Sequence, residues 1–407
     1  MSRFRGFQVD WYSGASAQLE LFAPKARVRR GPGNYQLKYT PPFRSTIRPP
    51  IENRPLGSQE LDPIGRSLDK FATDLSSRAV RPMAGMQPAG IDDSSSSESD
   101  MKRLGNQLLD LLIPRNIQVD LRNRGLFLEV GMDEGLLDYP WELMHDGDDF
   151  LCLKHYVGRF VNASENSIPP AVPPRDWLNS KLENLSVLVV SVPSPEPRDD
   201  TEYEQLPGAE AETEAISKTL DGLRKRGVKY NLIKDRNATF DNVWSALRDD
   251  YQIIHFIGHA TYNDKDPFRS GLVLYNQDMT SGQVASFFSK KPPVLCFMNA
   301  CETGRTGSLG TRAWKSTQNI FGLARAFLTT GTYLLGSRWK LGDKAAAIFA
   351  TKFYSLLLGN EKPIGDAITE ARKACKETSP EDPFSWASYI FYGDPRLYFR
   401  RAQTARE

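Results

Sequence analysis

The feature that most constrains the fold is a series of apolar, β-branched runs between residues 185 and 337, alternating with segments of helical spacing. The first run, LSVLVVSV at 185–192, has almost no polar position, which is typical of a strand buried on both faces of a parallel sheet. Strands are expected at 185–192, 228–234, 251–257, 294–298 and 332–336, and helices at 208–226, 240–248, 320–328, 344–358 and 364–378. This alternation predicts an α/β fold, a three-layer α/β/α sandwich with a mostly parallel sheet.

The first half of the chain has a different pattern. Short β-prone runs separated by Gly and Pro in residues 1–55 predict the strands of a small sheet, and a helical stretch is expected at 62–75. The pattern divides the chain into a β-rich N-terminal region (1–84), a Ser-rich loop (85–100), a helix-containing segment (101–168), a Pro-rich linker (169–176) and the main domain (177–400).

Composition excludes several classes of protein. Lys and Arg total 52 against 50 Asp and Glu, so no global basic excess indicates nucleic-acid binding, and the basic clusters at 25–30 and 400–401 are interpreted as solvated faces. No apolar run approaches the roughly 20 residues that cross a bilayer, and the N-terminus lacks the apolar core of a signal peptide. Four cysteines without a CxxC pair indicate neither a disulfide scaffold nor a structural zinc site. We expect a cytoplasmic protein with no membrane partner, metal or cofactor.

Two of the expected strands end in residues that can carry chemistry. Gly258-His259-Ala260 follows the third strand, and NACETG, which contains Cys301, follows the fourth. Parallel strands present their carboxyl ends at one edge of a sheet, where active sites form. A thiol and an imidazole there can act as nucleophile and base, with the backbone N–H groups of Ala260 and Cys301 as oxyanion donors. The alternative is a buried structural cysteine and an unrelated histidine.

Other candidate sites are weaker. His255 and His259 have the spacing of a helical zinc pair, but four residues of strand span roughly 13 Å, so a metal site is not expected. The run GRTGSLGTR at 304–312 lacks the Gly-Lys-Ser/Thr of a phosphate loop and is interpreted as a loop that shapes a cleft. Cys296 is expected in the core, and Cys375 on a partly exposed helix face.

Several stretches in this order resemble the CHAT peptidases, which are caspase-like cysteine proteases of clan CD related to separase. The resemblance rests on HFIGHA at 255–260, LCFMNACETG at 295–304, GSRWKLGD at 336–343 and WASYIFYGDP at 386–395, with LDYPWELM at 137–144 upstream. It covers about residues 105–400. It implies a caspase-type fold in which His259 is the general base and Cys301 the nucleophile.

The resemblance also implies details of the site. The family usually has Gly where this chain has Ala260, so the N–H is kept but a Cβ enters the site. In relatives such as separase an Asp after the tryptophan of the fifth strand lies in the S1 pocket and pairs with a basic P1 residue, and Asp343 is at the matching position. The alternative is that Asp343 caps the helix expected to begin at Lys344. Arg338 and Lys340 could instead neutralise Asp343 or favour an acidic or neutral P1 residue.

The resulting prediction is a regulated cysteine endopeptidase. Bacterial members of the family often cut one dedicated protein, such as a gasdermin or another protease, in defence against phage. An activating partner is expected, because the glycine-containing loop at 302–316 would have to become ordered around the nucleophile. The alternative is a catalytically silent caspase-like scaffold or sensor that binds protein partners.

Overall fold

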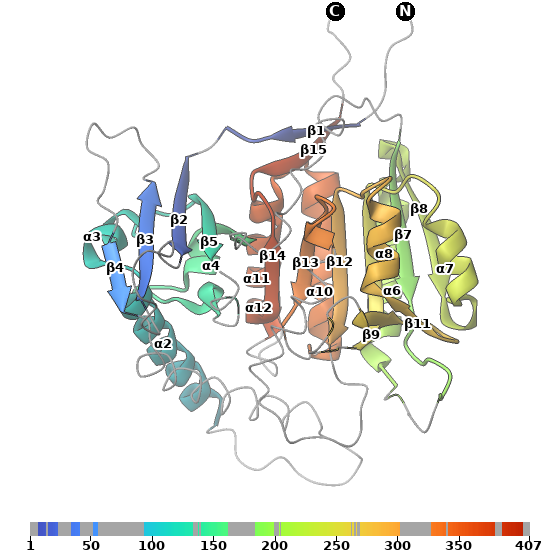
Figure 1. Cartoon of the computed structure of the whole chain (residues 1–407), viewed down its shortest axis with the longest axis horizontal. Helices are drawn as coiled ribbons and strands as arrows, with labels where there is room; N and C mark the ends of the chain where they lie inside the picture. The colour runs from blue at the N-terminus through green and yellow to red at the C-terminus, as the bar shows by residue number, and fades with distance from the viewer. Residues whose placement is uncertain are drawn as a thin grey trace, which may run out of the picture.

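One large mixed sheet runs through the computed structural model, with helices on both of its faces, and a separate two-stranded sheet pairs the first and last described strands (Figure 1). The structure describes residues 7–13, 15–22, 34–40, 52–55, 93–132, 137, 140–161, 184–198, 203, 205–261, 263, 266, 269–301, 327–338, 341–378 and 385–401. Within these ranges the sheet contains thirteen strands. The predicted α/β class with a mostly parallel sheet between helices is confirmed.

The C-terminal half of the sheet is a block of parallel strands. Their order in space is β8 (Val228–Lys234), β7 (Leu185–Ser191), β9 (Ile253–Thr261), β12 (Leu295–Cys301) and β13 (Tyr333–Ser337). At one side of this block, a short antiparallel pair, β10 (Gly271–Val273) and β11 (Asp278–Thr280), continues from the end of β9. The sequence predicted the five parallel strands, but neither of the two three-residue strands.

Helices cover both faces of this block. The chain steps outward from β7 to β8 through α6 (Pro207–Leu223) and back to β9 through α7 (Phe240–Ala246), so right-handed crossovers place these two helices on opposite faces. On the face of α7 lies α8 (Ser281–Phe288), whose Phe287 contacts Trp244 of α7 at 4.3 Å between ring centroids. With α6 lie α10 (Asp343–Tyr354) and, beside it, α11 (Ile364–Thr378) (Figure 1).

The remaining helical segments are short. They are η3 (Arg224–Arg226), η4 (Asp235–Asn237), the π-helical turn η7 (Ser355–Gly359) and α12 (Ser385–Ser388). The helix predicted at 208–226 therefore ends three residues early in a tighter turn, and Gly227 closes that turn in the left-handed conformation (φ 88°) that glycine adopts without strain.

The N-terminal half of the sheet continues from β14 (Tyr389–Tyr392), which is antiparallel to β13. The strands that follow in space are β6 (Tyr156–Val161), β5 (Phe127–Met132), β2 (Ser16–Phe22), β3 (Asn34–Thr40) and β4 (Glu52–Pro55). β1 (Phe7–Trp11) pairs with β15 (Leu397–Arg401) near the two ends of the chain. The helical elements of this half are α2 (Asp93–Leu112), α3 (Arg115–Asp120), η2 (Trp141–Leu143) and α4 (Leu151–Lys154).

Two expectations for this half were wrong. The N-terminal strands form no small sheet of their own, because β2 pairs in parallel with β5 and buries Ala17 and Leu19 against the main core. Residues 93–100 of the predicted Ser-rich loop form the first turns of α2, whose later turns bury Met101, Leu104 and Leu108. Helix formation is cooperative, so a helix whose apolar face packs against the core can extend into a neighbouring polar segment. The helix expected at 62–75 and the linker at 169–176 lie outside the described residues.

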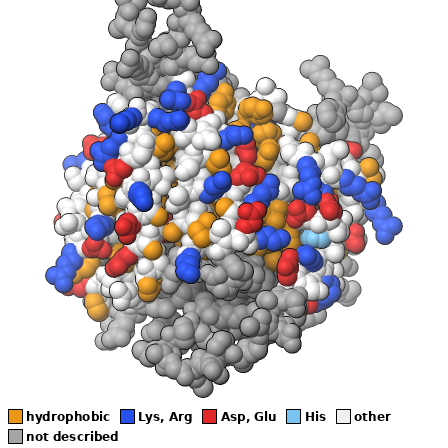
Figure 2. Space-filling model, turned by 180° about the vertical axis from the view of Figure 1, so that it is seen from behind, with side chains coloured by type: hydrophobic (Ala, Val, Ile, Leu, Met, Phe, Trp, Pro, Cys, Tyr) orange, Lys and Arg blue, Asp and Glu red, His pale blue; other side chains and the backbone are white. Residues whose placement is uncertain are grey.

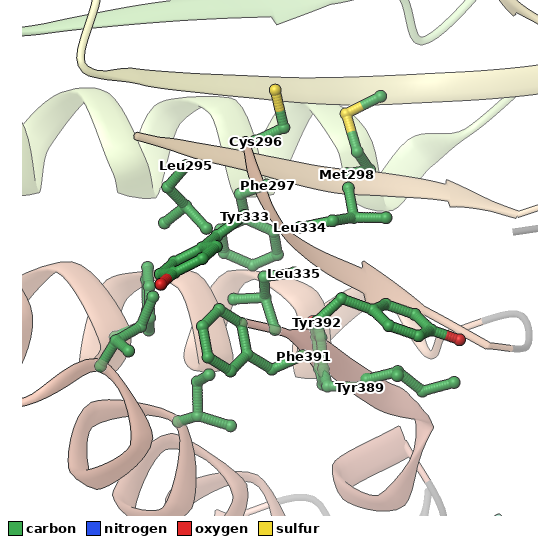
Figure 3. Packing of buried hydrophobic residues seen from close by; sticks show 14 of the residues in the cluster. Leu295, Cys296, Phe297, Met298, Tyr333, Leu334, Leu335, Tyr389, Phe391 and Tyr392 are labelled. Carbon is green, nitrogen blue, oxygen red and sulfur yellow. The ribbon is translucent and has the colours of Figure 1, made fainter. Parts of the chain in front are cut away.

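The core is continuous between the two halves. Figure 3 shows buried side chains of β12, β13 and β14, with Phe297 on one side of β12 and Cys296 and Met298 on the other. Phe297 is fully buried and lies within 6.0 Å, centroid to centroid, of the rings of Phe349, Phe353 and Tyr389. Burying such a side chain contributes about 2 kcal/mol to folding, so this cluster holds the sheet against α10.

The surface carries charges of both signs. On the face shown in Figure 2, Lys and Arg side chains are interspersed with Asp and Glu side chains. Arg401, from one of the basic clusters noted in the sequence, has its Nε 2.5 Å from Oε1 of Glu361, while residues 25–30 lie outside the described ranges. Among the described helices, none is both long and apolar enough to span a membrane.

Candidate active site

The parallel pairing of β9 and β12 brings the two predicted dyad residues together. Cys301, the last residue of β12, is the register partner of His259 on β9. Neighbouring strands lie about 4.8 Å apart, so the two backbones are in direct contact at the carboxyl edge of the sheet. The His259 side chain is fully buried, and its ring lies 5.7 Å from that of Tyr203, just before α6.

The strands are longer than predicted. The sequence placed His259 and Cys301 in loops after the strands, but β9 extends to Thr261 and β12 to Cys301. β9 continues because Ala260 and Thr261 pair with Leu272 and Gly271 of β10, a hairpin partner too short to be predicted. Both residues are therefore held by sheet hydrogen bonding, which fixes the backbone more firmly than a loop does.

The direction of the Ala260 N–H follows from the alternation along β9. The carbonyl of Ile257 accepts a hydrogen bond from the N–H of Val192, on the β7 side of the strand. Backbone groups alternate sides from residue to residue in a strand, so the N–H of Ala260 faces the other side, that of β12 and Cys301. The N–H of Ala260 thus points at the backbone of Cys301.

A set of polar side chains that the sequence analysis missed lies beneath this edge. We call it the strand-end cluster: Glu212 of α6, His255 of β9, Asn299 of β12 and Tyr354 of α10. None of the four is more than 8 % exposed. A signal for Glu212 was present in the sequence, because it falls on the apolar stripe of α6 formed by Ala209, Ile216 and Leu220.

Asp343 is the first residue of α10, and Gly342 occupies the N-cap position. The alternative that Asp343 caps a helix beginning at Lys344 is therefore wrong by one residue. Because β12 and β13 are parallel, the N-terminus of α10, a few residues beyond the end of β13, is reached from the same edge of the sheet as Cys301. An acidic residue in the first turn is also favoured by the helix dipole.

The other cysteines have structural surroundings. Cys296 lies in the core as predicted, and burial raises the pKa of its thiol well above the ordinary value. Cys375 was expected to be partly exposed, but it is 1 % exposed and its Sγ donates to the carbonyl of Ala345. Burial also raises the pKa of the Cys152 thiol, to about 12. All three thiols are buried, and those of Cys152 and Cys296 also have raised pKa values, which does not suit a nucleophile.

His255 and His259 lie in the same strand, β9, and not on one face of a helix, where this spacing could form a zinc pair. His255 is engaged inside the strand-end cluster rather than at the sheet edge. No group of three or more His, Cys, Asp or Glu side chains within the described ranges is arranged to hold a metal ion.

One protein family matches most of the chain. The sequence model of the CHAT domain matches residues 102–394. No curated protein sequence matches the chain.

Solved structures with a similar fold include separase from Saccharomyces cerevisiae in complex with securin (13 % identity, 82 % of this chain and 22 % of that chain, TM-score 0.38). The Arg-specific cysteine proteinase gingipain R shares 13 % identity over 84 % of this chain and 76 % of its own, with a TM-score of 0.39. The Drosophila initiator caspase Dronc shares 10 % identity over 47 % of this chain and 73 % of its own, with a TM-score of 0.29. This chain thus spans about a fifth of the separase chain.

Proposed function

The chain belongs to the CHAT domain family, and from this membership we propose that it is a cysteine endopeptidase in which Cys301 is the nucleophile and His259 the base. The observation that carries the proposal is the register of the two neighbouring strands, which pairs Cys301 with His259 at the carboxyl edge of the sheet. A scaffold that only binds partners has no need for a thiol and an imidazole at this one pair of positions.

The proposed reaction passes through an acyl-enzyme thioester, and His259 transfers the protons in its formation and in its hydrolysis. The Cys301 thiol gives its proton to His259, and the sulfur attacks the carbonyl carbon of the scissile peptide bond. The N–H groups of Ala260 and Cys301 stabilise the negative oxygen of the tetrahedral intermediate. His259 then protonates the leaving amine as the C–N bond breaks. A water molecule hydrolyses the thioester and restores the thiol.

We further propose that Asp343 selects the residue on the N-terminal side of the cleaved bond. It begins α10 at the edge of the sheet where the dyad lies, and a carboxylate in a partly desolvated pocket favours a cationic partner. The substrate would then carry Arg or Lys at P1.

The biological setting that we propose is the cleavage of one dedicated protein, such as a gasdermin or another protease, in bacterial defence or cell-death signalling. This step rests on the family resemblance alone. An activating partner would act on the segment directly after Cys301.

The test is to incubate the purified chain with a fluorogenic peptide library that varies P1, and to co-express it with each protein encoded beside it. We expect cleavage by the wild-type chain and by Cys296→Ala, and none by Cys301→Ala. Cleavage by Cys301→Ala at the wild-type rate would refute the proposal. An intact partner that binds wild type and Cys301→Ala equally would favour the scaffold alternative.

A further inference from the structure

The strand-end cluster places a carboxylate in the protein interior, directly below the proposed dyad. The side chain of Glu212 is 2 % exposed, and that of His255 is fully buried. Removing a carboxylate from water without partners costs several kcal/mol, so a buried one is retained only where its surroundings compensate.

The contacts of Glu212 join both strands of the site. Asn299 of β12 donates a hydrogen bond from Nδ2 to Oε1 of Glu212. The same oxygen lies 3.2 Å from Nε2 of His255 on β9. A single carboxylate oxygen on α6 thus contacts both neighbouring strands, two residues before Cys301 on β12 and four residues before His259 on β9.

The fourth member of the cluster, Tyr354, contacts the other ring nitrogen of His255. Nδ1 of His255 lies 3.0 Å from the hydroxyl oxygen of Tyr354 on α10. Burial and the nearby charge of Glu212 raise the pKa of the Tyr354 phenol well above its ordinary value, so the hydroxyl keeps its proton and can donate it. Tyr354 can therefore donate to Nδ1 of His255, while Nε2 of the same ring lies on the side of Glu212.

The cluster stands in a fixed relation to the dyad. Asn299 precedes Cys301 by two residues on β12, and His255 precedes His259 by four residues on β9. Side chains two or four residues apart in a strand lie on the same face, so the cluster shares the α6 and α10 face with His259. A shift of either strand relative to α6 would break a contact of Glu212 and change the spacing of the dyad.

We propose that Glu212 is a positioning residue, which sets the relative placement of Cys301 and His259 by holding Asn299 and His255 from α6. The proposal deepens the cysteine-peptidase assignment above and rests on it. Glu212 itself touches no reacting atom. Its effect is on the geometry of the dyad, to which rates of attack are steeply sensitive.

The test compares Glu212→Gln with a control on the next residue. Gln keeps the volume and can still accept from Asn299, but it removes the negative charge that faces His255. The control is Thr213→Val, which removes the 2.7 Å hydrogen bond from Thr213 to Ser191 of β7 and leaves β9 and β12 untouched. Both residues are buried on the same turn of α6, so a general loss of packing would affect the two variants alike.

Two readouts do not depend on peptidase activity. The first is the rate at which iodoacetamide alkylates Cys301, read by peptide mass, since Cys152, Cys296 and Cys375 are buried. The second is the imidazole region of the NMR spectrum, where the chain has only four histidines to assign. The third readout, kcat and KM for a cleaved peptide, tests the effect on turnover.

We expect Glu212→Gln to lower kcat about 10- to 100-fold with little change in KM, to slow Cys301 alkylation and to shift the His259 ring signals. Thr213→Val should leave all of these at wild-type values. If the chain cleaves no peptide, the peptidase assignment fails, while alkylation and NMR still decide whether Glu212 positions the dyad. Unchanged alkylation and His259 signals in folded Glu212→Gln, or equal changes in both variants, would overturn the proposal.

Should Glu212→Gln fail to fold, Tyr354→Phe replaces it. Phe keeps the ring packed against His255 and Phe297 and removes only the hydroxyl that contacts Nδ1. A smaller change in the same direction, in alkylation rate and in the His259 signals, supports the proposal. Wild-type values in both would overturn it.

Discussion

Each half of the sheet buries a cluster around a carboxylate, and these two clusters contact different parts of the sheet. In the N-terminal half, Arg159 of β6 pairs with Glu142 of η2. In the C-terminal half, Glu212 contacts Asn299 of β12 and His255 of β9 on the face of the sheet that α6 and α10 cover. Both clusters surround a buried carboxylate, but the first contacts groups that join the two halves of the sheet, and the second contacts the strands that carry the proposed dyad.

The Arg159–Glu142 pair lies where the halves meet. β6 and β14 are joined at the register pair of Arg159 and Tyr392, and the guanidinium lies 6.0 Å from the centre of the Tyr392 ring. Nε of Arg159 donates to Glu142 at 2.7 Å, and NH1 donates to the carbonyl of Leu137 at 2.9 Å. Burial alone would raise the pKa of Glu142, but the charge and hydrogen bond of Arg159, together with the charge of Arg372, outweigh burial and hold that pKa below its ordinary value.

Close backbone packing surrounds the same junction. An ideal Cβ placed on Gly158 would lie 2.2 Å from the carbonyl oxygen of Gly393, so only glycine fits there. The comparison teaches that the burial of a carboxylate does not by itself tell what the carboxylate does. What it holds in place decides whether it serves stability or the geometry of a site. The two halves should therefore respond differently to substitution.

The largest expected effect is on chemistry in the C-terminal half. Cys301→Ala and His259→Ala should each lower the rate of peptide cleavage by several orders of magnitude, because a nucleophile or its base is removed. Timed cleavage assays with purified, folded variants measure this loss of rate. Cys296→Ala is the matched control on the same strand, and it should cost only about 1–2 kcal/mol of stability. Equal losses of activity in Cys296→Ala and Cys301→Ala would contradict the assignment of Cys301, rather than Cys296, as the nucleophile.

The next effect is on stability in the N-terminal half. Arg159→Met leaves Glu142 buried without its cation and should lower the free energy of unfolding by about 3–5 kcal/mol, measured by urea denaturation. Replacing both partners, as Arg159→Met with Glu142→Gln, should cost less than the single change. Activity per folded molecule should stay at the wild-type value. A loss of kcat in folded Arg159→Met would contradict the claim that this ion pair serves stability alone.

A pH effect of similar size is expected from His155, between α4 and β6. Nε2 of His155 lies 2.9 Å from the carbonyl oxygen of Leu121, and Nδ1 accepts from the N–H of Leu126. Burial lowers the pKa of His155 from 6.5 to about 4. Between these values the unfolded chain binds more protons than the folded one, so stability falls as the pH is lowered from 6.5 to 4.

The loss over this range should be about 3 kcal/mol, from the size of the pKa shift. Urea denaturation at several pH values would measure it, with His155→Gln as the comparison. The variant should have a flatter profile between pH 4 and 6.5. Parallel profiles for the two proteins would mean that His155 is protonated in the folded state.

The smallest expected effect is a change of specificity at Asp343. Asp343→Asn keeps a residue that is favourable at a helix start, so stability should change by less than about 0.5 kcal/mol. The preference for Arg or Lys over Ala at P1 should fall about tenfold or more, since a charged hydrogen bond is lost. A P1 peptide scan with wild type and variant measures this. An unchanged P1 profile would leave Asp343 with a role in the helix alone.

Sequence reasoning reached the parts of the fold that local pattern determines. β8 and α11 have their predicted limits, and buried β-branched runs identified the parallel strands. The partners of β2 could not be predicted, because pairing between residues 16–22 and 127–132 depends on contacts remote in sequence. β10 and β11 are too short to show a period.

For the candidate site as well, sequence reasoning identified the residues that follow recognisable strands and missed the buried polar side chains. His259 and Cys301 were identified because each follows a recognisable strand, and the structure pairs their backbones. Glu212 was overlooked because AETEAI reads as a solvated helix face, and only its position on the apolar stripe indicates burial. Tyr354 gave no signal, since a tyrosine near the end of an apolar helix is an ordinary core residue.

The central claim, a Cys301–His259 nucleophile and base, is tested most directly by covalent labelling. Peptidyl acyloxymethyl ketones with Arg, Asp or Ala at P1 form a thioether with an attacking cysteine as the carboxylate leaves. Intact mass and peptide mapping should show one adduct, on Cys301, which forms at least about 100-fold more slowly in His259→Ala. An adduct on another cysteine, no adduct with any of the three reagents, or an equal rate in His259→Ala would contradict the account.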